Sequence, residues 1–145
     1  MNNHYLIIAG ILSIMVSLTH LAIIIGGPEW YRFFGAGESM AMMAEQGLIK
    51  PILITLLIAV VLFVWGLYAF SAVGLMPRLP FLKFSMVAIT SVYLLRGLAG
   101  LLVLFFPEVS YVKNLGINFL LCSSLICGLI GIIHMIGLIK IWPKI

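Results

Sequence analysis

Residues 91–102 read SVYLLRGLAGLL and place one arginine, Arg96, inside an apolar run that extends from residue 84 to residue 107. Three further runs contain no Asp, Glu, Lys or Arg, namely 6–27, 51–77 and 114–139. A helix needs about 20 apolar residues to cross a hydrocarbon core of about 30 Å. Backbone groups in lipid must also bond within their own segment. The runs therefore predict transmembrane helices, at about 5–26, 51–74, 84–106 and 114–140.

The composition agrees with this prediction. Of the 145 residues, 64% are hydrophobic and 8% are charged, whereas a soluble domain carries roughly 25% charged residues. So few charges cannot cover a surface that faces water. We therefore expect an all-α fold, an integral membrane bundle of four transmembrane helices that forms a single domain over residues 1–145.

Basic residues predict the orientation of this bundle. The side that holds both termini carries four of them, and the other side carries three together with all four glutamates. The basic residues on the terminal side are Arg78, Lys83, Lys140 and Lys144, and those on the other side are Arg32, Lys50 and Lys113. The positive-inside rule counts Lys and Arg near the membrane. It favours a multi-pass protein of the cytoplasmic (inner) membrane with both termini in the cytoplasm.

The first outer loop, residues 27–50, is the longest connection. Its second half contains good helix formers around Glu38 and Glu45. A short extra helix is therefore expected there, lying at the surface. Because these two glutamates are seven residues apart, they would share one face of that helix.

Polar residues in the predicted spans indicate a binding site in the outer half of the bundle. A cation at mid-membrane costs from about 2.5 to 10 kcal/mol or more, so Arg96 should face inward and have a partner. Its fork suits a carboxylate or phosphate. The candidate ligand-binding residues are Arg96, His20, Glu38, Tyr93, Asn118 and Ser17. In the alternative interpretation, Arg96 pairs with Glu38, with Glu45 or with backbone carbonyls, and only pins the loop.

Small residues mark the faces on which helices approach closely. Gly97 and Gly100 share one side of the third helix with Arg96. A Gly- and Ser-rich stripe on the fourth helix is a candidate seam for a homodimer. Cys122 and Cys127 point about 140° apart around that helix, so they cannot pair and are expected to pack as small residues.

The remaining polar residues do not suggest metal, cofactor or nucleic-acid chemistry. His134 is expected near the inner end of the fourth helix, at the interface. His20 lies more than about 10 Å from that level at a rise of 1.5 Å per residue, so the two histidines cannot hold one haem. We therefore expect no metal site, no cofactor and no catalytic residue, and no motif indicates nucleic-acid binding.

Several segments resemble a known family. They are His20, GGPEWYRFFGAGE at 26–38, WGLYAFSAVG at 65–74, LPFLK at 79–83 and YLLRGL at 93–98. Together they resemble a family of small bacterial four-helix integral membrane proteins of unassigned function. The resemblance covers about the first hundred residues, and it implies no biochemical role.

Three functions follow from these patterns. The first is a non-catalytic binding or accessory protein that holds a lipid-like or quinone-like ligand, or a partner membrane subunit, at Arg96. The second is a small, oligomeric transporter, proton-coupled through His20 and Glu38. The third is a small membrane enzyme that uses His20 or Glu38 as its acid/base group. Membrane lipids are the expected surroundings in each case.

Overall fold

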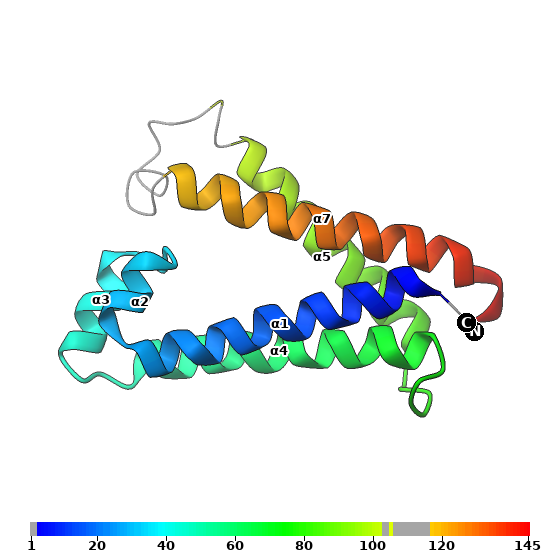
Figure 1. Cartoon of the computed structure of the whole chain (residues 1–145), viewed down its shortest axis with the longest axis horizontal. Coiled ribbons are helices and arrows are strands. Elements are labelled where there is room, and N and C mark those ends of the chain that lie inside the picture. Colours follow the sequence, from blue (N-terminus) through cyan, green and yellow to red (C-terminus); the bar gives the residue numbers. More distant parts are fainter. Residues whose placement is uncertain (1–2, 103–104, 106–116) are drawn as a thin grey trace.

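A computed structural model of the chain describes residues 3–102, 105 and 117–145, with the side chain of Asn118 left out (Figure 1). Within these residues the fold is built on four long helices, α1 (His4–Gly26), α4 (Lys50–Ala72), α5 (Leu82–Leu102) and α7 (Ile117–Ile141). All four are long and apolar enough to cross a membrane. The fold is therefore all-α, and its helices indicate a multi-pass membrane protein.

Three short helices complete the described fold: α2 (Pro28–Phe33), α3 (Glu38–Glu45) and η2 (Trp142–Lys144). The short helix expected in the first loop is found as α3, and α2 is an additional one. Gly27 separates α1 from α2 because its φ of 71° lies in the left-handed region that favours glycine. Pro28 then begins α2, where a residue without an N–H loses no hydrogen bond.

The long helices pack as two pairs, α1 with α4 and α5 with α7, and glycines bring the backbones of each pair together. A Cβ atom added to Gly66 would lie 2.9 Å from the carbonyl oxygen of Gly10, and one added to Gly97 would lie 2.6 Å from the Cα of Gly128. Such spacing admits only glycine. The small-residue stripe of α7 is thus covered by α5 of the same chain. This corrects the expectation that it forms a seam between two copies.

The two pairs meet at the end of the bundle where both termini lie, here called the terminal end (Figure 1). A core cluster there combines residues of α1, α5 and α7 with the end of α4: Leu6, Ala72, Val73, Leu82, Met86, Leu138 and Ile141. Asn3 strengthens the junction, since its Nδ2 donates a 2.7 Å hydrogen bond to the Gly137 carbonyl. The side-chain oxygen of Asn3 also caps α1 by accepting from the Leu6 N–H.

Away from the terminal end the pairs diverge, and α2 with α3 forms a cap at the far end of α1 and α4 (Figure 1). This cap end has a core of its own, in which Ile23, Tyr31 and Ala41 are buried together. The cap also reaches the other pair, because Gly35 lies against the ring of Phe119 on α7. The cap therefore contacts both helix pairs where they are farthest apart.

Candidate functional site

Arg96 lies on α5 and points to α7, where its guanidinium is held by two adjacent serines. Its Nη1 donates to the Ser124 Oγ at 2.8 Å, and its Nη2 donates to the Ser123 Oγ at 3.1 Å. Ser123 in turn donates to the Leu120 carbonyl at 3.2 Å. Close packing at Gly97 and Gly128 brings the serines within reach, because these glycines let α5 and α7 nearly touch.

Both partners of this guanidinium are neutral hydroxyls, so its positive charge is not balanced by them. Among the described residues, none of the ion pairs includes Arg96. Its remaining N–H groups likewise have no hydrogen-bond partner in the described part of the chain. Arg96 is half-buried. The arrangement orients a cation and leaves donors for an anionic or carbonyl group.

The carboxylates expected to pair with Arg96 bind a different arginine. In the cap, Arg32 contacts Glu29 at 2.9 Å, Glu38 at 2.7 Å and Glu45 at 2.7 Å. The interpretation in which Glu38 or Glu45 neutralises Arg96 is therefore wrong. The hydrogen bond from Arg32 holds the pKa of the Glu38 carboxyl below its ordinary value, and the two carboxylates raise the pKa of Arg32.

Tyr93 lies one turn from Arg96 on α5, about 4.5 Å nearer the terminal end, and it contacts the three other long helices. Its hydroxyl donates to the Ser13 Oγ of α1 at 2.9 Å. Its ring meets Trp65 of α4 edge-on, with centroids 5.1 Å apart, and stacks on His134 of α7 at 5.5 Å. Tyr93 is thus the residue through which the two pairs meet beside Arg96.

The structure corrects the expected position of His134. It is fully buried rather than at the interface, and both ring nitrogens lack a hydrogen-bond partner within the described residues. A neutral imidazole carries one N–H donor and one acceptor, so this ring is an unsatisfied polar group beside Tyr93. The position of His134 in the sequence predicts its level along α7 but not its direction around the helix. An i, i+4, i+7 spacing with Cys127 and Gly131 was the only signal for its buried face.

Two of the candidate residues on α1 have partners within the helix pair. Ser17 is buried, and its Oγ donates to the Ala59 carbonyl of α4 at 2.7 Å. His20 is half-buried, with its Nδ1 2.8 Å from the Val16 carbonyl. A carbonyl can only accept, so Nδ1 carries the proton and Nε2 is left as an acceptor in the neutral ring. Ser17 therefore links α1 to α4, whereas His20 keeps one nitrogen for another partner.

No hydrogen bond joins one candidate residue to another within the described part of the chain. Arg96 and Tyr93 lie one turn apart on α5 and contact the bundle interior, whereas Glu38 lies in the cap and is bound to Arg32. Glu38 and His20 each have a different hydrogen-bond partner, which does not favour an acid–base pair. The side chain of Asn118 lies outside the described residues. Within the described part of the chain, no group of three His, Cys, Asp or Glu side chains could hold a metal ion.

Known proteins do not extend this description. Comparison of the chain with protein-family models, with curated proteins and with solved structures finds no significant match in any of the three. The resemblance of segments in the first hundred residues is therefore not supported by a family match. The geometry around Arg96 is therefore the feature of the molecule that bears on its function.

Proposed function

We propose that this chain is a non-catalytic binding or accessory protein of the cytoplasmic membrane. Its Arg96 would hold the anionic or carbonyl group of a lipid-like or quinone-like ligand, or of a partner membrane subunit, where the helix pairs diverge. One observation carries the proposal: the guanidinium of Arg96 is oriented by two neutral serine hydroxyls and has no carboxylate partner among the described residues. An uncompensated cation in a membrane span is costly, so a counter-charge or polar ligand would stabilise it.

Neighbouring residues support this role. Tyr93 and Ser13 fix the contact between the pairs one turn away, which limits how far Arg96 can move. On α1, the Nε2 of His20 has no hydrogen-bond partner among the described residues. An amphiphile suits these surroundings, because the outer faces of the helices expose many large apolar side chains. A ligand with an anionic head and an apolar body would satisfy both features.

The test compares two variants that remove the same hydrogen bonds. Arg96→Met removes the charge, and the double variant Ser123→Ala with Ser124→Ala removes the hydroxyls but keeps the charge. Each is purified in a mild detergent and examined by native mass spectrometry for bound small molecules. We expect the wild type and the serine variant to retain a ligand and Arg96→Met to lose it. Loss of two interhelical hydrogen bonds should lower stability by only about 1 kcal/mol in either variant.

The opposite pattern would refute the proposal. If all three proteins carry the same bound molecules, or none, while both variants lose stability equally, Arg96 serves only to join α5 to α7. Unfolding of Arg96→Met is excluded by comparing its thermal transition with that of the serine variant. The same spectra report the mass of the assembly and thereby test for a homodimer or a partner subunit.

A second candidate, a proton-coupled transporter, is favoured by His134. This imidazole is fully buried and has no hydrogen-bond partner among the described residues. Titratable groups inside membrane spans often mark proton pathways, and the His134 ring stacks on Tyr93, whose hydroxyl is bonded to Ser13. Solute uptake into vesicles that follows a pH gradient, and that is lost in His134→Phe, would favour this candidate over the first.

A further inference from the structure

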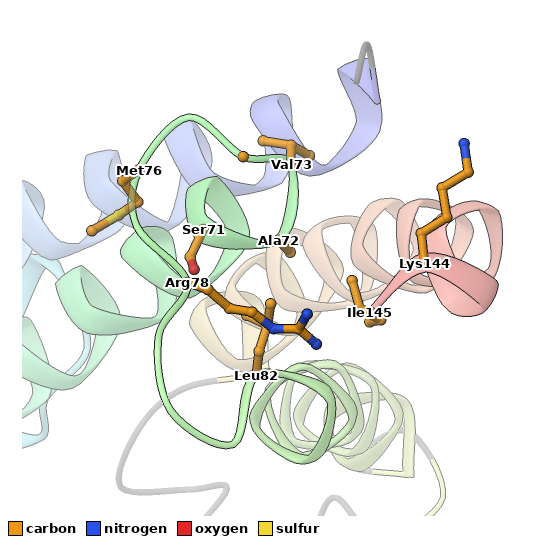
Figure 2. Close-up of a pocket in the computed structure, with 9 residues that line it drawn as sticks. Ser71, Ala72, Val73, Met76, Arg78, Leu82, Lys144 and Ile145 are labelled. Carbon is orange, nitrogen blue, oxygen red and sulfur yellow. The ribbon is translucent and has the colours of Figure 1, made fainter.

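A second polar region, far from Arg96, lies at the terminal end of the bundle. A pocket of about 420 Å³ is formed where α4 ends, the loop 73–81 turns back, α5 begins and the residues after α7 return (Figure 2). Arg78 and Lys144 are the cationic residues that line it. Figure 2 shows the guanidinium of Arg78 extended across the pocket toward Ile145, and the ammonium of Lys144 at the rim, pointing away.

The loop around Arg78 is held rigidly on both sides of this residue. The hydroxyl of Ser71 donates to the Pro77 carbonyl at 3.0 Å and accepts from the Leu79 N–H at 2.9 Å. The Tyr68 hydroxyl donates to the Pro80 carbonyl at 3.2 Å. Two prolines reduce the freedom of the loop further. Its conformation is therefore fixed before any ligand arrives.

The Arg78 side chain itself has no partner in this fixed loop. Among the described residues it takes part in no hydrogen bond and no ion pair. The sequence explains why, since its acidic side chains are confined to Glu29, Glu38, Glu45 and Glu108. The described segments that form the terminal end contain no Asp or Glu.

The other two cations of the terminal end have contacts within the fold. Lys83 donates to the main-chain oxygens of Trp142 and Ile145 at 3.5 and 3.3 Å, and lies 4.2 Å from the centroid of the Trp142 ring. Lys140 lies 4.0 Å from the centroid of the Tyr5 ring. Arg78 differs from these two lysines. Its rigid backbone presents it to a pocket, and within the described part of the chain its side chain has no protein partner.

Large apolar side chains flank the lining residues along the chain. Leu75, Phe81 and Phe84 are 62%, 82% and 76% exposed. Phe81 also has a φ of 52°, a left-handed conformation that is uncommon for a bulky residue. Strained backbone of this kind gathers at ligand sites. Here the left-handed residue carries an exposed aromatic side chain and follows Arg78 by three residues in the sequence.

We propose that this pocket binds the phosphate group of an anionic phospholipid. The planar fork of Arg78 matches two phosphate oxygens, Lys144 has a flexible stem that can bring its ammonium to the same group, and the exposed aromatic rings would contact the acyl chains. The pocket lies at the ends of α4 and α5, both long enough to cross a membrane, which is the level of lipid headgroups. Basic pockets at this level are known to hold acidic lipids. The site is independent of the one proposed at Arg96.

The test uses the whole chain in mild detergent with equal amounts of phosphatidylglycerol and phosphatidylcholine, and measures bound lipid by native mass spectrometry. We expect the wild type to bind more phosphatidylglycerol than phosphatidylcholine. Arg78→Gln should weaken that binding about tenfold, the effect of losing a charge-assisted hydrogen bond. The matched control is Lys140→Gln, which removes the same charge from the same end but outside the pocket, and should change binding less than about twofold.

Two further measurements separate the alternatives. Ser71→Ala frees the loop and keeps the charge, so it should weaken lipid binding less than Arg78→Gln does. Millimolar inorganic phosphate should not displace the lipid, and displacement would mean that a soluble phosphate is the ligand. If Arg78→Gln and Lys140→Gln weaken lipid binding equally, the proposed site is refuted. That result would show a general attraction between acidic lipid and a basic surface. Because Arg78 is exposed, Arg78→Gln should have the same melting temperature as the wild type.

Discussion

Arg96 and Arg32 occupy opposite surroundings, and the difference decides what each can do. Arg32 is ion-paired with three carboxylates at the protein surface. Its charge is therefore neutralised within the cap, where the ion pairs hold α2 against α3. Arg96 lies in a long apolar helix and is held by serine hydroxyls. Hydroxyls orient a guanidinium without neutralising it. Arg96 therefore keeps a charge for a ligand, whereas Arg32 has none to offer.

The ion pairs of Arg32 make the cap sensitive to acid. Because the hydrogen bond from Arg32 lowers the pKa of Glu38 below its ordinary value of 4.5, the folded cap binds this proton less tightly than the unfolded chain does. The stability that this ion pair gives the cap is therefore fully present above pH 4.5, and it is lost as the pH falls through the lowered pKa of Glu38 in the folded state. We expect hydrogen exchange in residues 28–45, corrected for intrinsic rates, to stay constant from pH 7 to about 5 and to accelerate below about 4.5.

Glu38→Gln provides the control for this dependence. It removes the titrating carboxyl, so exchange in the cap should be faster than in the wild type at neutral pH and should change less on acidification. Identical exchange in Glu38→Gln and the wild type at neutral pH would contradict the role assigned to this pair.

At the scale of elements, glycine contacts set the separation of the helices in each pair. The contact between Gly97 and Gly128 matters most for the proposed site, because the same approach of α5 to α7 brings two serines to Arg96. The contact is asymmetric. A Cβ atom on Gly97 would lie 2.6 Å from the backbone of Gly128, whereas one on Gly128 would lie 3.8 Å from the Cα of Gly97.

This asymmetry predicts different effects for two alanine substitutions. Gly97→Ala places a methyl group against backbone that cannot rotate away, so α7 must move, at a cost of about 1–3 kcal/mol. In Gly128→Ala the new methyl group makes only ordinary van der Waals contact. Because alanine favours a helix over glycine, this substitution should leave the stability unchanged or raise it by up to about 1 kcal/mol. Equilibrium unfolding in detergent micelles measures both values. Equal destabilisation by the two substitutions would show that the helices do not pack at these glycines.

The sequence predicts the four long helices more readily than the contacts between them. A run of about 20 apolar residues has few alternatives to a helix, so all four were predicted, and helix-forming residues around Glu38 were enough to predict α3. The partners of Arg96 were not predicted, and neither was the burial of His134. A sequence gives the level of a residue along a helix, but its direction depends on how neighbouring helices rotate. In α7 apolar residues occur on every side, so periodicity does not identify the inner face.

At the scale of the whole molecule, charge is divided between the two ends. Glu29, Glu38 and Glu45 lie in the cap, whereas Arg78, Lys83, Lys140 and Lys144 lie in segments of the terminal end. A surplus of Lys and Arg favours retention in the cytoplasm. We therefore propose that the terminal end faces the cytoplasm and the cap faces outward, which is the orientation expected from the sequence.

Cysteine labelling tests this orientation. Cys122 and Cys127 are first replaced by alanine, and a single cysteine is introduced as Ser39→Cys in the cap or Lys144→Cys at the terminal end, both at exposed positions. A membrane-impermeant maleimide should modify Ser39→Cys in intact cells and Lys144→Cys only after permeabilisation. Modification of both in disrupted cells controls for reactivity. The reverse pattern in intact cells would place the basic end outside.

The position of Tyr93 has a practical consequence for spectroscopy. Its ring lies 5.1 Å from that of Trp65, and the two belong to different helix pairs. Excitation energy absorbed by the Tyr93 phenol should pass to the Trp65 indole more efficiently while the pairs are docked, whereas transfer from Tyr68, which shares α4 with Trp65, does not depend on docking. With Trp30 and Trp142 replaced by phenylalanine, the difference in emission between this protein and its Tyr93→Phe variant becomes an intrinsic optical gauge of whether the halves of the bundle stay together.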